Sequence, residues 1–160
     1  DINKEDLPAL RMLMLAHHYR QPINYSDELL EEYKKIYHNL EKKLKMNSLE
    51  LMIEQYPFVQ PEESFQNEIK EILAKDFDTP NVITRIYQLI KDLNKSGKSL
   101  DKGKYYDKIV WVFNVLGIAL QLETSDEDIN LYNSWRESRA QKNYEQADII
   151  RKKLMEKGYL

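Results

Sequence analysis

The chain has 160 residues, the size of one ordinary domain or two small ones, with 24 Lys and Arg against 27 Asp and Glu. Its net charge of −3 by itself argues against a nucleic-acid-binding protein. Because it contains no cysteine, it can form neither a disulfide scaffold nor a cysteine-ligated metal site. The longest apolar run, residues 109–120, contains Asn114 and is too short to span a bilayer. We therefore expect a cytoplasmic protein without a membrane partner.

The basic residues are distributed unevenly along this acidic chain. Residues 136–157 carry seven Lys or Arg and four acids, and residues 91–108 carry six Lys and three Asp, a local charge of +3 in each. The acids gather elsewhere, as in ETSDED at residues 123–128. This distribution weakens the argument that the net charge makes against nucleic-acid binding.

Only 4 Gly and 5 Pro predict an all-α fold with short loops. In chain order, apolar residues at a spacing of three and four predict helices over 6–19, from Ser26 to beyond Leu44, over 49–55 and over 62–75. A further helix is predicted to have Thr79 as its N-cap and to run from Pro80 to about 93. Residues 94–104 read as a flexible loop, and 105–122 as the central buried helix. Two more helices follow, one capped by Ser125 and running to about 142, the other over 144–157 before Gly158.

Two short patterns suggest chemistry but fit it poorly. SGKS at 96–99 lacks the first glycine of a phosphate-binding loop, because Asp92 stands there, and no strand is predicted before it. His17 and His18 are adjacent, so on a helix they point about 100° apart and do not chelate a metal as an i, i+4 pair would. We predict no metal site and no catalytic residue in this chain.

The end of the first predicted helix is basic and aromatic. His18, Tyr19 and Arg20 precede a turn at Pro22, and such a helix terminus can contact phosphate and stack on a base. Equally, Arg20 could pair with a carboxylate while Tyr19 packs, and spacing alone favours this second interpretation.

Three segments, in order, resemble cysteinyl-tRNA synthetases. ALRMLMLAHHYRQPINYS (9–26) resembles the segment just past the catalytic core, FQNEIKEILAKDFDTPNVITRIYQLIKDLN (65–94) the family's helical DALR domain, and RAQKNYEQADIIRKKLMEKGY (139–159) its C-terminal helices. The chain departs from the family's pattern by the second histidine before Tyr19, by Lys75 in place of Asp, by Ser138 in place of Ala and by Tyr144 in place of Trp or Phe.

The resemblance implies three parts: the end of the catalytic-core or stem-contact region (1–24), a DALR-type bundle (25–124) and an anticodon-binding helical unit (125–160). It further implies that the catalytic domain, with its ATP, magnesium and zinc, lies before Asp1. The segment KLKMNSLE (43–50) is not the KMSKS loop of that domain. The resemblance also implies that a short tail follows Leu160. The whole enzyme would ligate cysteine to tRNA-Cys, while this monomeric part binds the tRNA and contacts its own catalytic domain.

The same resemblance assigns residues 135–154 to anticodon recognition, with Arg139 as a forked donor, Tyr144 as a stacking ring and Asp148 as an acceptor for base amino or imino groups. Arg136, Lys142 and Arg151, with His18, Tyr19 and Arg20, would contact the tRNA backbone. The alternatives left open are that Tyr144 is a core residue in a stripe with Ala147, Ile150 and Leu154, and that Asp148 pairs with Lys152.

Three other identities remain possible: another class I synthetase, a paralogue that couples cysteine to a sugar amine, and a free-standing helical interaction module without an RNA role. The KNYEQAD segment argues against the first, and the paralogue would have no need of an anticodon-reading end. The interaction module predicts no binding to tRNA at all.

Overall fold

The computed structural model describes residues 3–97 and 99–160, which divide into two compact units. One unit comprises the chain up to His38 together with Tyr56–Leu120, and the other comprises Asn39–Gln55 with Gln121–Leu160. The described residues form seven α-helices and a short 3-10 helix at Lys4–Asp6, and contain no strand. The predicted all-α fold is therefore confirmed.

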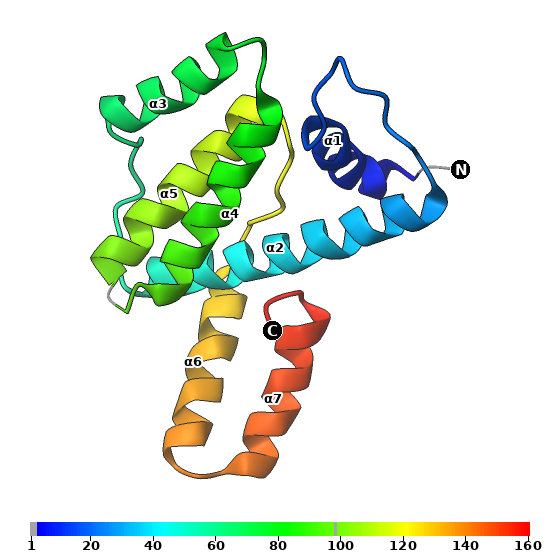
Figure 1. Cartoon of the computed structure of the whole chain (residues 1–160). Coiled ribbons are helices and arrows are strands. Elements are labelled where there is room, and N and C mark those ends of the chain that lie inside the picture. The colour runs from blue at the N-terminus through cyan, green and yellow to red at the C-terminus, as the bar shows by residue number, and fades with distance from the viewer. Residues whose placement is uncertain (1–2, 98) are drawn as a thin grey trace. The chain divides into compact units, whose positions relative to one another are not determined.

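The first unit is built around a pair of helices, α4 (Thr79–Lys95) and α5 (Ser99–Leu116), which pack along each other (Figure 1). Two shorter helices, α1 (Leu7–Leu15) and α3 (Glu63–Ala74), also contact α4. The buried face of α4 consists of Val82, Ile83, Ile86, Leu89 and Leu93. This spacing of three and four residues is the one expected of an amphipathic helix in a core.

Polar groups close the ends of these helices. The Asp78 carboxylate, rather than Thr79, caps α4 by accepting from the backbone N–H of Asn81. α1 ends at Leu15 rather than near residue 19, and the ring Nδ1 of His17 lies 2.8 Å from the Leu13 carbonyl oxygen that the helix leaves unpaired. Helix α5 ends at Leu116 rather than near residue 122, because Gly117 turns the chain with a φ of 64°.

Two of the predicted boundaries were wrong in the middle of the chain. The predicted loop over 94–104 is mostly helical, since α4 continues to Lys95 and α5 begins at Ser99; Lys98 lies outside the described residues. The predicted short helix over 49–55 is the last part of α2 (Asp27–Ile53), which runs without interruption. The first error arose where charged and polar residues at the start of α5 resemble a loop when read without the packing, and the second where the polar residues Asn47 and Ser48, which are buried inside α2, interrupt the apolar pattern.

The second unit is a helical hairpin with a supporting segment. α6 (Asp126–Ala140) and α7 (Tyr144–Glu156) run antiparallel to each other (Figure 1). Leu49, near the end of α2, completes their core. The buried members of this cluster are Leu49, Tyr132, Ile150, Leu154 and Tyr159.

A buried carboxylate ties the two ends of the hairpin together. Ser125 and Asp128 form a capping box at the start of α6. Asp128 also accepts from the Tyr159 hydroxyl at 2.9 Å and lies 2.8 Å from the Lys157 Nζ. Gly158, with a φ of 80°, ends α7 in a Schellman motif that returns Tyr159 to the core. These contacts fix the register of α6 against α7.

The compact units and the three sequence-based parts divide the chain differently. The boundary at Leu120 and Gln121 lies close to the expected one at 124/125, but residues 39–55 belong to the unit that contains α6 and α7. Residues up to 24 belong to the unit of α3–α5.

Candidate nucleic-acid interface

One face of the α6–α7 hairpin is grooved. Trp135 and Arg139 lie one turn apart on α6, and Tyr144, Asp148 and Arg151 occupy successive turns of α7. A turn of three residues joins the two helices, and Asn143 begins α7 by accepting from the backbone N–H of Gln146. Because the hairpin is antiparallel, the two rows of side chains face the same groove.

The groove has a volume of about 490 Å³ and brings together all three predicted base-reading residues. Its lining consists of Trp135, Arg139, Tyr144, Ala147, Asp148, Arg151 and Leu160. Tyr144 is 64% exposed, so it is not the core residue that the alternative interpretation makes it; Ala147, Ile150 and Leu154 alone form the buried stripe. A volume of this size is within the range of small-ligand sites.

Arg139 is held by an aromatic ring rather than by a carboxylate. Its guanidinium carbon lies 5.0 Å from the centre of the Trp135 ring, within cation–π range. Among the residues that the structure describes, no hydrogen bond or ion pair occupies the Arg139 guanidinium. Its five N–H donors therefore remain available to a ligand in the groove.

Asp148 and Arg151 put opposite charges on the same helix face. Both side chains are exposed, and within the described part of the chain neither has an ion-pair partner, including the Asp148–Lys152 pair that the sequence left open. The groove thus combines an aromatic ring at its rim, an acceptor-only carboxylate and two guanidinium groups. This set can stack on a planar ring, accept protons from it and donate to oxygen or ring nitrogen.

Two residues predicted as backbone contacts do not line the groove. Arg136 lies on α6 with its guanidinium carbon 6.0 Å from the centre of the Tyr132 ring. Lys142 is in the turn between the helices, with a positive φ of 60°. Both side chains are exposed.

The remaining predicted contacts, His18, Tyr19 and Arg20, lie in the first unit and converge on Asp76. The Tyr19 hydroxyl and the Arg20 Nη2 donate to the Asp76 Oδ1 at 2.6 and 3.0 Å, and the His18 Nε2 lies 3.6 Å from its Oδ2. The hydrogen bond from Tyr19, followed by the charge of Arg20, lowers the pKa of Asp76, and the same bond raises the pKa of Tyr19. Arg20 pairs with a carboxylate, as the second interpretation has it, whereas Tyr19 is 60% exposed rather than packed.

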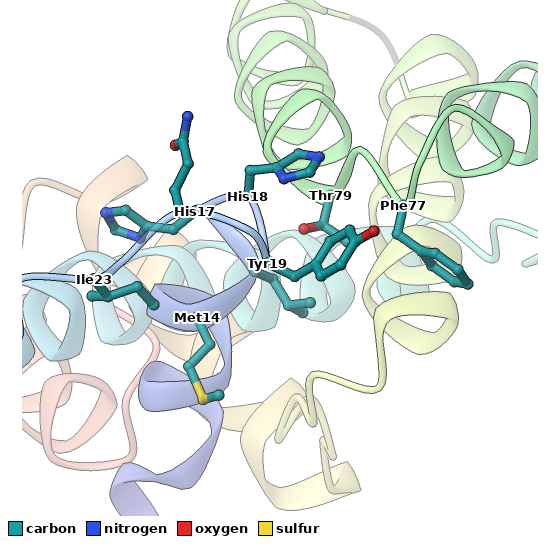
Figure 2. Close-up of a pocket in the computed structure, with 9 residues that line it drawn as sticks. Met14, His17, His18, Tyr19, Ile23, Phe77 and Thr79 are labelled. Atoms are coloured by element: carbon teal, nitrogen blue, oxygen red, sulfur yellow. The ribbon is translucent and has the colours of Figure 1, made fainter.

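An apolar pocket of about 630 Å³ lies beside this cluster, and Figure 2 shows His18 and Tyr19 extending toward Thr79 and Phe77 across it. Met14 and Ile23 supply further apolar surface, and Phe77 is 69% exposed. Phe77 follows Asp76, and both have positive φ angles, of 52° and 58°. This backbone turn places Asp76 where Tyr19 and Arg20 reach it.

Neither a metal site nor a membrane span emerges from the described residues. Within 3–97 and 99–160, no group of three His, Asp or Glu side chains could hold a metal ion. No helix over the same residues is long and apolar enough to cross a membrane.

The sequence analysis missed Trp135, Leu160 and Asp76. Trp135 stands one helical turn before Arg139, and this spacing could have identified it as a neighbour on the same face. Leu160 and Asp76 had no such signal, because only the tertiary structure brings them to Tyr144 and to Tyr19.

Comparison with known proteins shows that the chain is similar to part of one group of enzymes. No family model matches it. It is 38% identical over 153 residues to the cysteine–tRNA ligase of Acholeplasma laidlawii. The aligned region covers 95% of this chain and 34% of that relative. The cysteine–tRNA ligase of Thermosipho melanesiensis is 35% identical over 94% of the chain, and that of Onion yellows phytoplasma 28% identical over 100%. The chain spans about a third of the length of these relatives, between 34% and 37%.

Proposed function

Because the chain belongs to the cysteine–tRNA ligase family, we propose that it is the tRNA-binding part of such an enzyme and that the α6–α7 groove reads the anticodon loop. The observation that carries the proposal is that one groove is lined by Arg139, Tyr144 and Asp148. The three side chains differ in chemical type, and Arg139 lies on α6 whereas the other two lie on α7. Arg139 and Asp148 match positions of the family's C-terminal helices, and Tyr144 stands where the family has Trp or Phe.

The chemistry of the groove suits unpaired bases. RNA loops expose bases that proteins recognise by stacking on aromatic rings and by hydrogen bonds to the Watson–Crick edge. The exposed ring of Tyr144 offers a stacking surface, Arg139 offers a fork of donors and Asp148 offers acceptors for amino or imino groups. Arg151, Arg136 and Lys142 would neutralise phosphates beside the groove, which gives affinity and salt dependence without reading sequence.

The first unit would contact the tRNA away from the anticodon. The cluster of His18, Tyr19 and Arg20 lies on an exposed surface, but Asp76 partly neutralises it. We therefore assign it a weaker, backbone-directed role than the groove. The mixed charge of the cluster supports orientation of the tRNA rather than strong binding.

The activity of the whole enzyme would be ligation of cysteine to tRNA-Cys with ATP. We assign the ATP, magnesium and zinc sites to a catalytic domain outside these 160 residues. In this assignment the chain acts as a monomer joined to its own catalytic domain in the cytoplasm, and binding energy gained at the anticodon helps to orient the distant tRNA end.

The test is fluorescence-anisotropy titration of this chain with labelled tRNA-Cys and with the same tRNA carrying a swapped anticodon, at two salt concentrations. We expect tighter binding to the cognate anticodon. Arg139→Ala should weaken cognate binding by roughly 5- to 150-fold, since one good forked contact to a base contributes ~1–3 kcal/mol. Tyr144→Ala should lose a similar factor through stacking, ~1–3 kcal/mol per base.

Lys153→Ala is the matched control, because Lys153 is an exposed cation of α7 that does not line the groove. It should weaken both tRNAs equally and only at low salt. Equal loss of both tRNAs in Arg139→Ala would reduce the groove to a backbone contact. No binding to either tRNA at low salt would instead favour an interaction module without an RNA role.

A further inference from the structure

A continuous row of neighbouring side chains runs from the core of the second unit to the groove. The Tyr132 hydroxyl donates to Glu50 of α2 at 2.8 Å, and the Tyr132 ring is 6% exposed. The Trp135 ring lies 5.6 Å from the Tyr132 ring, centre to centre, and packs on the same buried cluster. The Arg139 guanidinium then lies over Trp135 at 5.0 Å.

Among the aromatic and charged residues that line the groove, Trp135 is the one that packs on the buried cluster, whereas Arg139, Tyr144, Asp148 and Arg151 are exposed. Its ring lies beside that of Tyr132 and also lines the groove. A tryptophan has only two side-chain torsions, so it is a rigid platform once one part of it is packed. The surface that it offers to Arg139 is therefore fixed before any ligand arrives.

The guanidinium of Arg139 gains its position from this ring. Immobilising a flexible arginine on binding lowers the affinity about two- to twelvefold. Tryptophan is the ring that attracts a cation most strongly. A guanidinium stacked on a ring face keeps its N–H groups at its edge, where they can donate in plane to a base. Among the described residues no other group holds Arg139, so its order depends on Trp135.

We propose that Trp135 is the positioning residue of the groove: it fixes Arg139 so that its donors meet the edge of an unpaired anticodon base. This inference rests on the proposed function and goes beyond it by making base discrimination depend on a side chain that need not touch the RNA. Loss of the ring should weaken the reading of the base while leaving the phosphate contacts of the hairpin intact.

The experiment is a double-mutant cycle of Trp135→Leu and Arg139→Ala in this chain, with anisotropy titrations against tRNA-Cys and the swapped-anticodon tRNA. Trp135→Leu should weaken cognate binding about two- to fivefold, the effect of losing an exposed cation–π contact of ~0.5–1 kcal/mol. Binding of the swapped tRNA should not change. In the Arg139→Ala background the second substitution should have no further effect, because the group that it positions is gone.

Trp135→Phe and Trp135→Met separate positioning from packing. Both are large and apolar, but only phenylalanine keeps a ring face for the guanidinium, so Phe should recover most of the discrimination and Met should not. This pair also serves if Trp135→Leu does not fold, and the melting temperature of each variant is measured beside its affinity. Equal discrimination by the Phe and Met variants would overturn the proposal.

The outcomes distinguish this inference from the proposed function. If the unsubstituted chain prefers the cognate anticodon and Arg139→Ala removes that preference, but Trp135→Leu leaves it unchanged, only the positioning role fails. It also fails if Trp135→Leu weakens binding by the same factor with and without Arg139, since the residue then acts only on folding. If the unsubstituted chain does not discriminate, the proposed function fails, and this inference with it.

Discussion

Replacing Asp128 by Asn should loosen the hairpin that carries the groove. Oδ2 of this buried carboxylate accepts from the Ser125 backbone N–H at 3.0 Å, the Ser125 hydroxyl at 2.9 Å and the Tyr159 hydroxyl at 2.9 Å. Oδ1 faces the Lys157 Nζ at 2.8 Å. Asparagine preserves the size of the side chain, and its single oxygen can serve Oδ2's three donors. Its NH₂ group then faces the Lys157 ammonium, a donor against a donor.

The size of the expected destabilisation follows from the loss of the contact between Asp128 and Lys157. A hydrogen bond to a charged group contributes ~1.5–3 kcal/mol to stability, and breaking a fully buried ion pair costs ~3–5 kcal/mol. The Lys157 side chain is 39% exposed, so water recovers part of that loss. We therefore expect Asp128→Asn to lower the free energy of unfolding of the second unit by about 2–3 kcal/mol.

The assay must report on the second unit alone, because the chain has two compact units and its unfolding need not be two-state. The chain has two tryptophans, and Trp111→Phe leaves Trp135 as the single reporter, within the hairpin. Urea unfolding followed by Trp135 emission then gives the stability of this unit. Asp126→Asn, an exposed acid of the same helical turn, is the control and should cost only ~0.3–1 kcal/mol through the helix dipole.

The pH dependence provides a second check on the same carboxylate. Burial raises the pKa of Asp128, but hydrogen bonds from Lys157, Ser125 and Tyr159 outweigh burial and hold the pKa well below its usual range. The stability from the charged form is therefore complete above the unfolded-state pKa of ~3.9 and is lost as the pH falls through the lower folded-state value. The difference between the unsubstituted chain and Asp128→Asn should be constant from about pH 5 to 8 and shrink below about pH 4. A difference no larger than that of Asp126→Asn, or one unchanged at pH 3, would refute the reasoning.

Two further substitutions test the backbone. Lys142→Gly should raise the free energy of unfolding of the hairpin by about 0.5–1 kcal/mol. The reason is that Lys142 has a φ of 60°, which is strained for any residue with a Cβ. A loss of stability in urea unfolding would contradict this prediction. Gly103→Ala should destabilise the first unit by about 2–3 kcal/mol, because the new Cβ would overlap the Tyr56 ring. Displacing this ring would also break the hydrogen bond that the Tyr56 hydroxyl donates to the buried Asp107 at 2.8 Å. Gly97→Ala meets no atom within 4 Å, so an equal change in melting temperature in both alanine variants would show that overlap is not the cause.

The sequence alone determined much of the local structure. The periodicity of α4 and the cap at Ser125 predicted where helices begin and which faces they bury, because these depend on neighbours three or four residues away. The same reasoning placed Gly158 at the end of α7. It was less reliable where a charged, exposed helix resembles a loop, as at the start of α5, and where one glycine ends a long apolar helix, as at Gly117.

For the candidate site, too, the sequence predicted individual residues, whereas the packing decided which of them lie together. The resemblance to cysteinyl-tRNA synthetases identified Arg139, Tyr144 and Asp148, but only the antiparallel packing of α6 on α7 brought them to one groove and exposed Tyr144. The partners of Arg20 and Asp128 lie 56 and 29 residues away along the chain, at Asp76 and Lys157. Local sequence sets the helices and their faces, because helix formation depends on nearby residues. Which polar groups meet depends on how those helices pack, and that is decided by the whole buried core at once.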